Sequence, residues 1–179
     1  PVVTDMQVMP VAGYDSMLMT ISGAHAPYFT SNLVILTDSS GNQGVGEIHG
    51  GEHTQVELES YIPLVVGQPI GNYRSVIRNL VDIKCASQET IWDGEGIQRL
   101  NISNLKYVIR AASAVETAML DLLGKFMDLP ICALLANGQQ RDKVRVLGYL
   151  FYVSNCSKAR PDLSYRDERD SDDPWFRLR

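Results

Sequence analysis

The sequence lacks an excess of positive charge and has no long hydrophobic run. Among 179 residues, 16 Lys and Arg are outnumbered by 21 Asp and Glu, which gives a formal net charge of -5. A nucleic-acid-binding domain needs a basic patch to neutralise phosphates, so we expect no nucleic-acid partner. The longest apolar run, Val146–Val153 with Gly148 counted in, has eight residues. A membrane-spanning helix needs roughly 18 or more, so we also expect no membrane partner.

Cysteines are few and widely spaced. The three of them, Cys85, Cys132 and Cys156, include no C-x-x-C pair. An odd number without such a pair predicts neither a disulfide framework nor a cysteine zinc site. The first residues, Pro1–Asp5, have neither the basic start nor the apolar core of a signal peptide. We therefore expect a cytoplasmic protein with reduced thiols.

What the chain does contain is an ordinary globular composition, 45% hydrophobic, and a set of short apolar segments near its start. Three of these segments read as strands: Thr4–Val11, Asn32–Thr37 and Gly44–Ile48. The dense turn signal Asp38–Asn42 joins the last two, so they predict a small antiparallel meander. Between the first two strands, Gly13–Ser31 is predicted to be a long loop, of the kind that is usually either a functional lid or disordered.

The middle of the chain is predicted to be helical. Thr54 and Glu57 fit a capping box at the start of one helix, which Pro63 would stop. A second helix is expected from Asn72, and a long one over Asn104–Met127. The long helix carries an apolar stripe that alanines widen almost all the way round, so it should be central and buried. The apolar positions of its stripe are Leu105, Val108, Ile109, Ala112, Val115, Met119, Leu122, Leu123 and Phe126.

The run Val144–Val153 ends in apolar residues that do not alternate, which predicts a strand buried on both faces in a parallel sheet. Such a strand needs neighbours on both edges. The following residues, 155–179, carry six basic and six acidic side chains and cannot form a core by themselves. Two explanations remain open: the strand pairs with an edge of the meander, or its partners belong to a part of the protein outside this chain.

Two groups of residues on this framework could carry chemistry. His49-Gly50-Gly51-Glu52-His53 matches the H-x-x-E-H order of inverted zinc peptidases, which need both histidines one turn apart on a helix. Two adjacent glycines argue against a helix there, so we interpret these histidines as exposed loop residues. Glu116 and Asp121 lie on different faces of the long helix, so structural ion pairs or caps are the expected role.

Two further features are weaker signals. Gly41, Gly44 and Gly46 lack the spacing of a phosphate loop and are interpreted as turn and strand glycines. His25, between small residues and Pro27, is either presented to a ligand or merely solvated.

Several separated strings, in the same order, resemble the glucarate dehydratases of the enolase superfamily, and the likeness runs to Trp175–Arg179. The strings are Asp15–Met19, Ser22–Pro27, Gly44–Ile48, Glu116–Gly124, Gly138–Arg141 and Leu147–Phe151. The resemblance implies an α+β fold: an enolase-type amino-terminal capping domain of a three-stranded antiparallel meander plus a helical bundle, followed by the first strand of an otherwise missing (β/α) barrel. The expected division is residues 1–143 for the cap and 144–179 for that strand and a charged loop.

The resemblance also implies a magnesium-dependent lyase that removes the proton next to a carboxylate of an aldarate and then expels water. His25 and Tyr149 match family positions that contact the substrate. A family threonine expected directly after Gln98 is replaced by Arg99, which places that contact in doubt. The family's K-x-K base motif is absent, since no two lysines here are two apart. No catalytic residue and no metal ligand is therefore assigned to this chain.

The expected function is thus the capping part of an acid-sugar dehydratase. Its expected partners are an aldarate substrate and either the missing barrel portion or a full-length homologue. The alternative is a non-catalytic, truncated dehydratase-like protein that acts, if at all, by association with a full-length relative. A homo-oligomer is compatible with either reading.

Overall fold

The structure is a computed structural model that describes residues 1–14, 19–20, 28–87, 102–148 and 152–153. The chain divides into two compact units. The larger unit comprises residues 1–11 and 30–142, and the smaller unit comprises residues 12–29 and 143–179.

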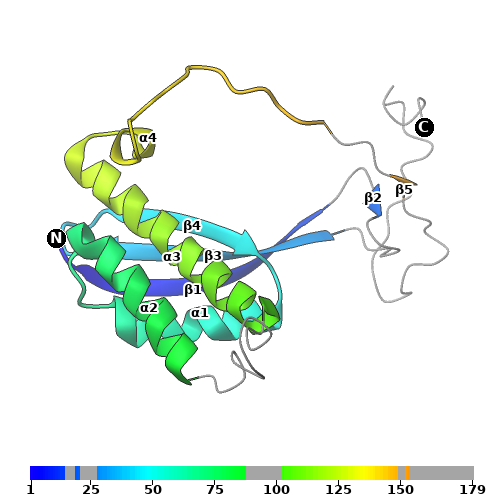
Figure 1. The fold of residues 1–179 in the computed structure, drawn as a ribbon, viewed down its shortest axis with the longest axis horizontal. Helices are drawn as coiled ribbons and strands as arrows, with labels where there is room; N and C mark the ends of the chain where they lie inside the picture. Colours follow the sequence, from blue (N-terminus) through cyan, green and yellow to red (C-terminus); the bar gives the residue numbers. More distant parts are fainter. Residues whose placement is uncertain (15–18, 21–27, 88–101, 149–151, 154–179) are drawn as a thin grey trace. The chain divides into compact units, whose positions relative to one another are not determined.

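A three-stranded sheet with the strand order β1-β3-β4 forms one layer of the larger unit (Figure 1). The bounds are β1 Val3–Tyr14, β3 Tyr28–Asp38 and β4 Gln43–His49. β3 and β4 run antiparallel. In the turn between them, Asp38 Oδ1 accepts the backbone N–H groups of Ser40 and Asn42 at 2.8 and 3.0 Å. The predicted antiparallel meander is confirmed.

The predicted loop over Gly13–Ser31 is wrong at both of its ends. β1 continues to Tyr14, β3 already begins at Tyr28, and a two-residue strand, β2 (Met19–Thr20), lies between them. Ala12 and Gly13 are exposed, as are Phe29 and Thr30. A strand without a buried face shows no alternation of apolar and polar residues, so its pattern cannot be told from that of a loop.

Helices cover one face of the sheet (Figure 1). Their bounds are α1 Glu52–Val65, α2 Tyr73–Ser87 after the 3₁₀ turn η1 Ile70–Asn72, α3 Ile102–Met127 and α4 Ile131–Leu134. α3 packs along β4, and both α1 and α2 pack against α3. The predicted second helix and the long central helix are confirmed. Within the described residues, no helix is both long and apolar enough to cross a membrane.

The predicted limits of α1 are wrong. The helix begins at Glu52, two residues before Thr54, and no side chain caps its Gly51 N-cap. Thr54 is only 6% exposed and lies inside the first turn, so no capping box forms around it. Pro63 does not stop the helix, which runs on to Val65. A proline this close to the end removes few helical hydrogen bonds, and the N–H of Val66 still reaches the carbonyl of Ile62 at 3.0 Å.

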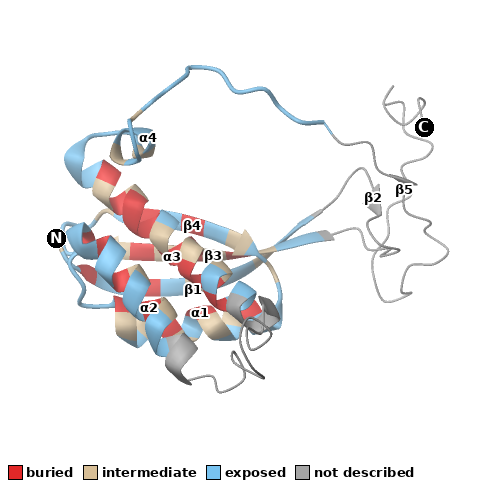
Figure 2. Cartoon of the chain, viewed as in Figure 1, coloured by how far each residue is buried: buried red, intermediate tan, exposed pale blue. Residues whose placement is uncertain are grey.

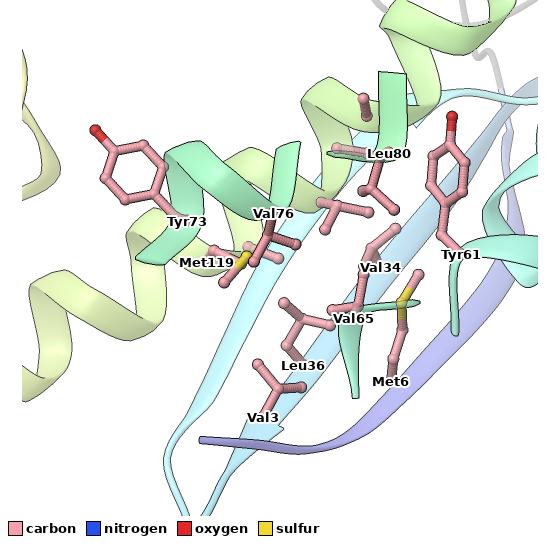
Figure 3. Close-up of a cluster of buried hydrophobic side chains, with 14 of the residues drawn as sticks. Val3, Met6, Val34, Leu36, Tyr61, Val65, Tyr73, Val76, Leu80 and Met119 are labelled. Carbon is pink, nitrogen blue, oxygen red and sulfur yellow. The ribbon is translucent and has the colours of Figure 1, made fainter. Parts of the chain in front are cut away.

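The core lies between the helices and the sheet, as the close-up in Figure 3 shows. Val34 and Leu36 of β3 point into it. Tyr61 of α1 and Met119 of α3 belong to the same cluster, and all four side chains are fully buried. Tyr61 also donates its hydroxyl to the carbonyl of Val108 at 3.3 Å. The buried positions gather where the helices face the sheet (Figure 2). This core stabilises the larger unit through the removal of apolar surface from water.

Two glycines let α3 approach the sheet closely. Gly44 and Gly46 stand opposite Leu36 and Val34 on β3. A Cβ atom added at Gly46 would lie 1.9 Å from the backbone oxygen of Ala114, and one at Gly44 would lie 2.2 Å from that of Ala118. These distances are far below van der Waals contact, so α3 can rest on β4 only where β4 has no side chains. The sequence identified these residues as strand glycines but did not identify what they pack against.

An ion pair on α3 satisfies two backbone groups at the free edge of β4. Asp121 Oδ2 accepts the N–H of Val45 at 2.9 Å, and Lys125 Nζ donates to the carbonyl of Gln43 at 2.6 Å. The two side chains also pair with each other at 2.8 Å. β4 is an edge strand, whose unpaired backbone groups otherwise invite pairing with another strand. The predicted structural role of Asp121 is confirmed.

We expect Asp121→Ala to lower the free energy of unfolding by about 1 kcal/mol, because it removes a charge-assisted hydrogen bond to backbone at a partly exposed site. Asp121→Asn keeps an oxygen acceptor for the N–H of Val45, so its free energy of unfolding should fall clearly less. Urea denaturation of both variants followed by circular dichroism measures the difference. Equal losses in the two variants would show that the hydrogen bond to β4 does not contribute.

The smaller unit contains one described strand pair. β2 pairs antiparallel with β5 (Tyr152–Val153), with Met19 opposite Val153 and Thr20 opposite Tyr152. The predicted strand over Val144–Val153 is wrong for residues 144–148, which have no regular secondary structure. Val144, Val146 and Leu147 are 75%, 93% and 71% exposed. A buried parallel strand forms only between neighbouring strands, and the described residues offer this segment none.

Candidate functional site

The groove at the junction of β4 and α1 is the candidate site in the larger unit. The chain crosses from strand to helix through Gly50 and Gly51, and the N–H of Gly50 donates to the carbonyl of Thr30 at 2.9 Å. The buried amide of Asn32 donates to the carbonyl of Gly51 at 3.3 Å. Gly51 has a φ of 135°, a conformation that side chains disfavour. β3 therefore holds this junction in place from one side.

α3 supplies the other wall of the groove. Tyr107 and Arg110 lie one turn apart on this helix. Together with His49–Thr54 they line a cavity of about 250 Å³. The rings of His53 and Tyr107 are 6.3 Å apart between centroids and tilted by 48°. Polar side chains from three elements, the carboxylate of Glu52 among them, thus line one groove.

The H-x-x-E-H string does not form a zinc-peptidase site. His49 is the last residue of β4 and His53 lies in the first turn of α1. Inverted zinc peptidases need both histidines on one face of a single helix. The expectation that the two histidines do not share a helix and are exposed is confirmed. Their interpretation as loop residues is wrong, because β4 extends to His49 and α1 begins before His53.

The substrate residues expected from the resemblance, His25 and Tyr149, lie outside the described residues, as does Arg99. Their proposed contacts therefore stay predictions. The stretch that contains His25 joins the end of β1 to the start of β3. β3 passes the groove directly afterwards, since Ser31 stands opposite His49 and Thr30 bonds to Gly50.

A second cavity of about 350 Å³ lies at the other end of α3, lined by Asp121, Lys125 and Asp128 among others. Its two best-placed charges, Asp121 and Lys125, are already engaged with β4. Across the part of the chain that the structure describes, no group of three or more His, Cys, Asp or Glu side chains could hold a metal ion. Asp121 and Lys125 therefore connect α3 to β4 at this second cavity.

Sequence reasoning missed Tyr107 and Arg110 as members of a site. They lie on a long helix whose polar positions resemble an ordinary solvated face. No local motif marks them, because their partners, His49–Thr54, are more than 50 residues earlier in the chain. Only the packing of α3 beside the strand-to-helix junction brings them together.

The fold of the larger unit is that of the amino-terminal capping domain of enolase-superfamily enzymes. An enolase from Mycobacterium smegmatis, solved with tartrate, superposes with a TM-score of 0.70 at 26% identity, over 89% of this chain and 36% of that one. An enolase from Pseudomonas fluorescens, solved with magnesium, potassium and tartrate, has a TM-score of 0.69 at 25% identity, over 85% and 35%.

Among curated proteins, the chain is similar to a probable glucarate dehydratase of Streptomyces coelicolor. The two are 28% identical over 152 residues, which cover 84% of this chain and 35% of the relative. The chain thus spans about a third of the length of the relatives that it matches, at their amino-terminal part. No protein-family model matches the sequence.

Proposed function

We propose that this chain is the capping part of a magnesium-dependent acid-sugar dehydratase. The observation that carries the proposal is the joint likeness, in sequence to a glucarate dehydratase and in fold to enolase-superfamily caps. Two of the solved relatives hold tartrate, a hydroxy acid with two carboxylates, which supports a substrate of the aldarate class. In the proposed division, residues 1–143 form the cap, and residues 144–179 form the first strand and charged loop of the barrel.

The described residues do not fit a magnesium site. Magnesium prefers several oxygen ligands in a near-octahedral arrangement, and this part of the chain has no cluster of potential ligands. Relatives solved with magnesium support its use by the complete enzyme. In the proposal, the ion and the proton-abstracting base belong to the barrel, and the role of this chain is to close over the substrate and exclude water.

The proposal is tested by supplying the barrel. The chain is fused to, or co-expressed with, the portion of the Streptomyces coelicolor relative that it does not match. We expect magnesium-dependent dehydration of glucarate, measured as formation of the keto acid, from the combination and none from either part alone. Activity from the 179-residue chain by itself, or no activity of the combination on any aldarate, would overturn the proposal.

A second candidate is a non-catalytic protein that associates with a full-length relative. The exposed apolar side chains of Val144, Val146 and Leu147 favour it, because they leave an unpaired apolar segment for another chain to cover. Mixing the chain with a full-length relative should then give a stable complex on size-exclusion chromatography. A monomer that forms no complex counts against this alternative.

His25 and Tyr149 are proposed to contact the substrate in the combined enzyme. We expect His25→Ala to lower kcat/KM by about tenfold to a hundredfold, the effect of one lost hydrogen bond to a charged substrate. The urea midpoint should stay within error, since the core described above forms between the helices and the sheet. Unchanged kinetics would remove His25 from the site, and a lowered urea midpoint would instead indicate a structural role.

A further inference from the structure

The outer edge of β4 is partly occupied by side chains of its own chain. In the described sheet, β3 pairs with one edge of β4, and the other edge has no neighbouring strand. On this outer edge the N–H of Val45 donates to Asp121, and the carbonyl of Gln43 accepts from Lys125. Successive residues of a strand direct their backbone groups to alternate edges, so Glu47 also faces the outer edge. The ion pair thus takes two backbone groups that an added strand would bond.

The residues of this outer edge suit pairing with a second copy of the same strand. In an antiparallel pair centred on Val45, two-fold symmetry places Val45 opposite its own copy and Gln43 opposite Glu47. Val45 is 44% exposed, so contact between the two valines would remove apolar surface from water. A glutamine opposite a glutamate brings no like charges together. The hydrogen bonds of this pair need the N–H of Val45 and the carbonyl of Gln43, which Asp121 and Lys125 hold.

We propose that the Asp121–Lys125 ion pair is an autoinhibitory contact, which keeps β4 of one chain from pairing with β4 of a second copy. An incoming strand has to displace two hydrogen bonds that each include a charged partner. Such bonds are stronger than the neutral bonds between backbone groups that would replace them. Strand pairing therefore does not offset the loss while the ion pair is intact. The proposal goes beyond the proposed function, because it requires neither the barrel nor a substrate.

Sedimentation velocity of the full chain over a series of protein concentrations tests this proposal. The double variant Asp121→Ala with Lys125→Ala should self-associate at least about tenfold more tightly than the parent chain, the effect of one lost charge-assisted hydrogen bond. Circular dichroism of the same samples checks that both chains are folded. Adding Val45→Lys to the double variant should return self-association to the parent level, because two lysines would then stand directly opposite each other.

Val76→Ala is the matched control for a loss of stability alone. Val76 lies on α2 and is 4% exposed, so its truncation weakens the core and leaves the ion pair intact. It should self-associate like the parent chain. Equal self-association of the parent and the double variant, Val76→Ala associating as tightly as the double variant, or no effect of Val45→Lys would each overturn the proposal. If the double variant fails to fold, Asp121→Asn with Lys125→Met keeps both shapes without the charges and should still associate more tightly than the parent.

Discussion

Gly46→Ala is expected to destabilise the larger unit by at least about 3 kcal/mol, at the upper end of what overpacking a core costs. The added Cβ would lie 1.9 Å from the backbone oxygen of Ala114 and 2.9 Å from its carbonyl carbon. A flexible side chain could turn away from such a contact, but a helix backbone cannot. β4 and α3 must therefore separate, and the buried surfaces between them would open. Urea denaturation of the full chain, followed by circular dichroism, measures the loss.

Gly71→Ala is the matched control for this substitution. Gly71 lies in the 3₁₀ turn η1, and a Cβ added there meets no heavy atom within 4 Å. We expect its free energy of unfolding to stay within about 0.5 kcal/mol of that of the parent chain. Adding Ala114→Gly to Gly46→Ala should restore none of the lost stability, because the added Cβ meets the backbone carbonyl of residue 114 and not its side chain. Equal midpoints for Gly46→Ala and Gly71→Ala would contradict the packing of α3 on β4.

Met119→Ala is expected to cost about 2 to 5 kcal/mol, the range for emptying a buried site of this size. Met119 is fully buried in the core between α3 and the sheet (Figure 3). Ile109→Ala on the same helix should cost less than about 1 kcal/mol, because Ile109 is 50% exposed and alanine is the better helix former. The two urea midpoints, measured side by side, test which face of α3 is buried.

The same two variants test whether the structure or the apolar stripe in the sequence gives the buried face of α3 correctly. The apolar stripe placed Ile109 and Met119 together on the buried face, whereas the structure buries only Met119. Similar losses in the free energy of unfolding of the two variants would favour the wider stripe and contradict the observed packing. A large loss for Met119→Ala alone would support it.

The sequence alone predicted the elements that have strong local patterns. Apolar repeats at helical spacing marked α3, and the turn residues Asp38–Asn42 between two apolar runs marked the β3–β4 hairpin. These features were confirmed because each depends on residues that are near one another in the chain. The same locality explains the errors at Thr54 and Pro63, where local capping and breaking signals were weaker than the packing of α1 against α3.

The sequence by itself determined the order of β1, β3 and β4 and of the helices α1, α2 and α3, the central place of α3 and the structural role of Asp121. Only the tertiary structure decided what Gly46 packs against, which side of α3 is buried, and that Arg110 and His53 share one groove. It also decided that residues 144–148 form no strand here, although their composition suits one. The physical reason is the same in each case: pairing, close approach and burial depend on partners that are distant in the chain, and a local pattern does not contain them.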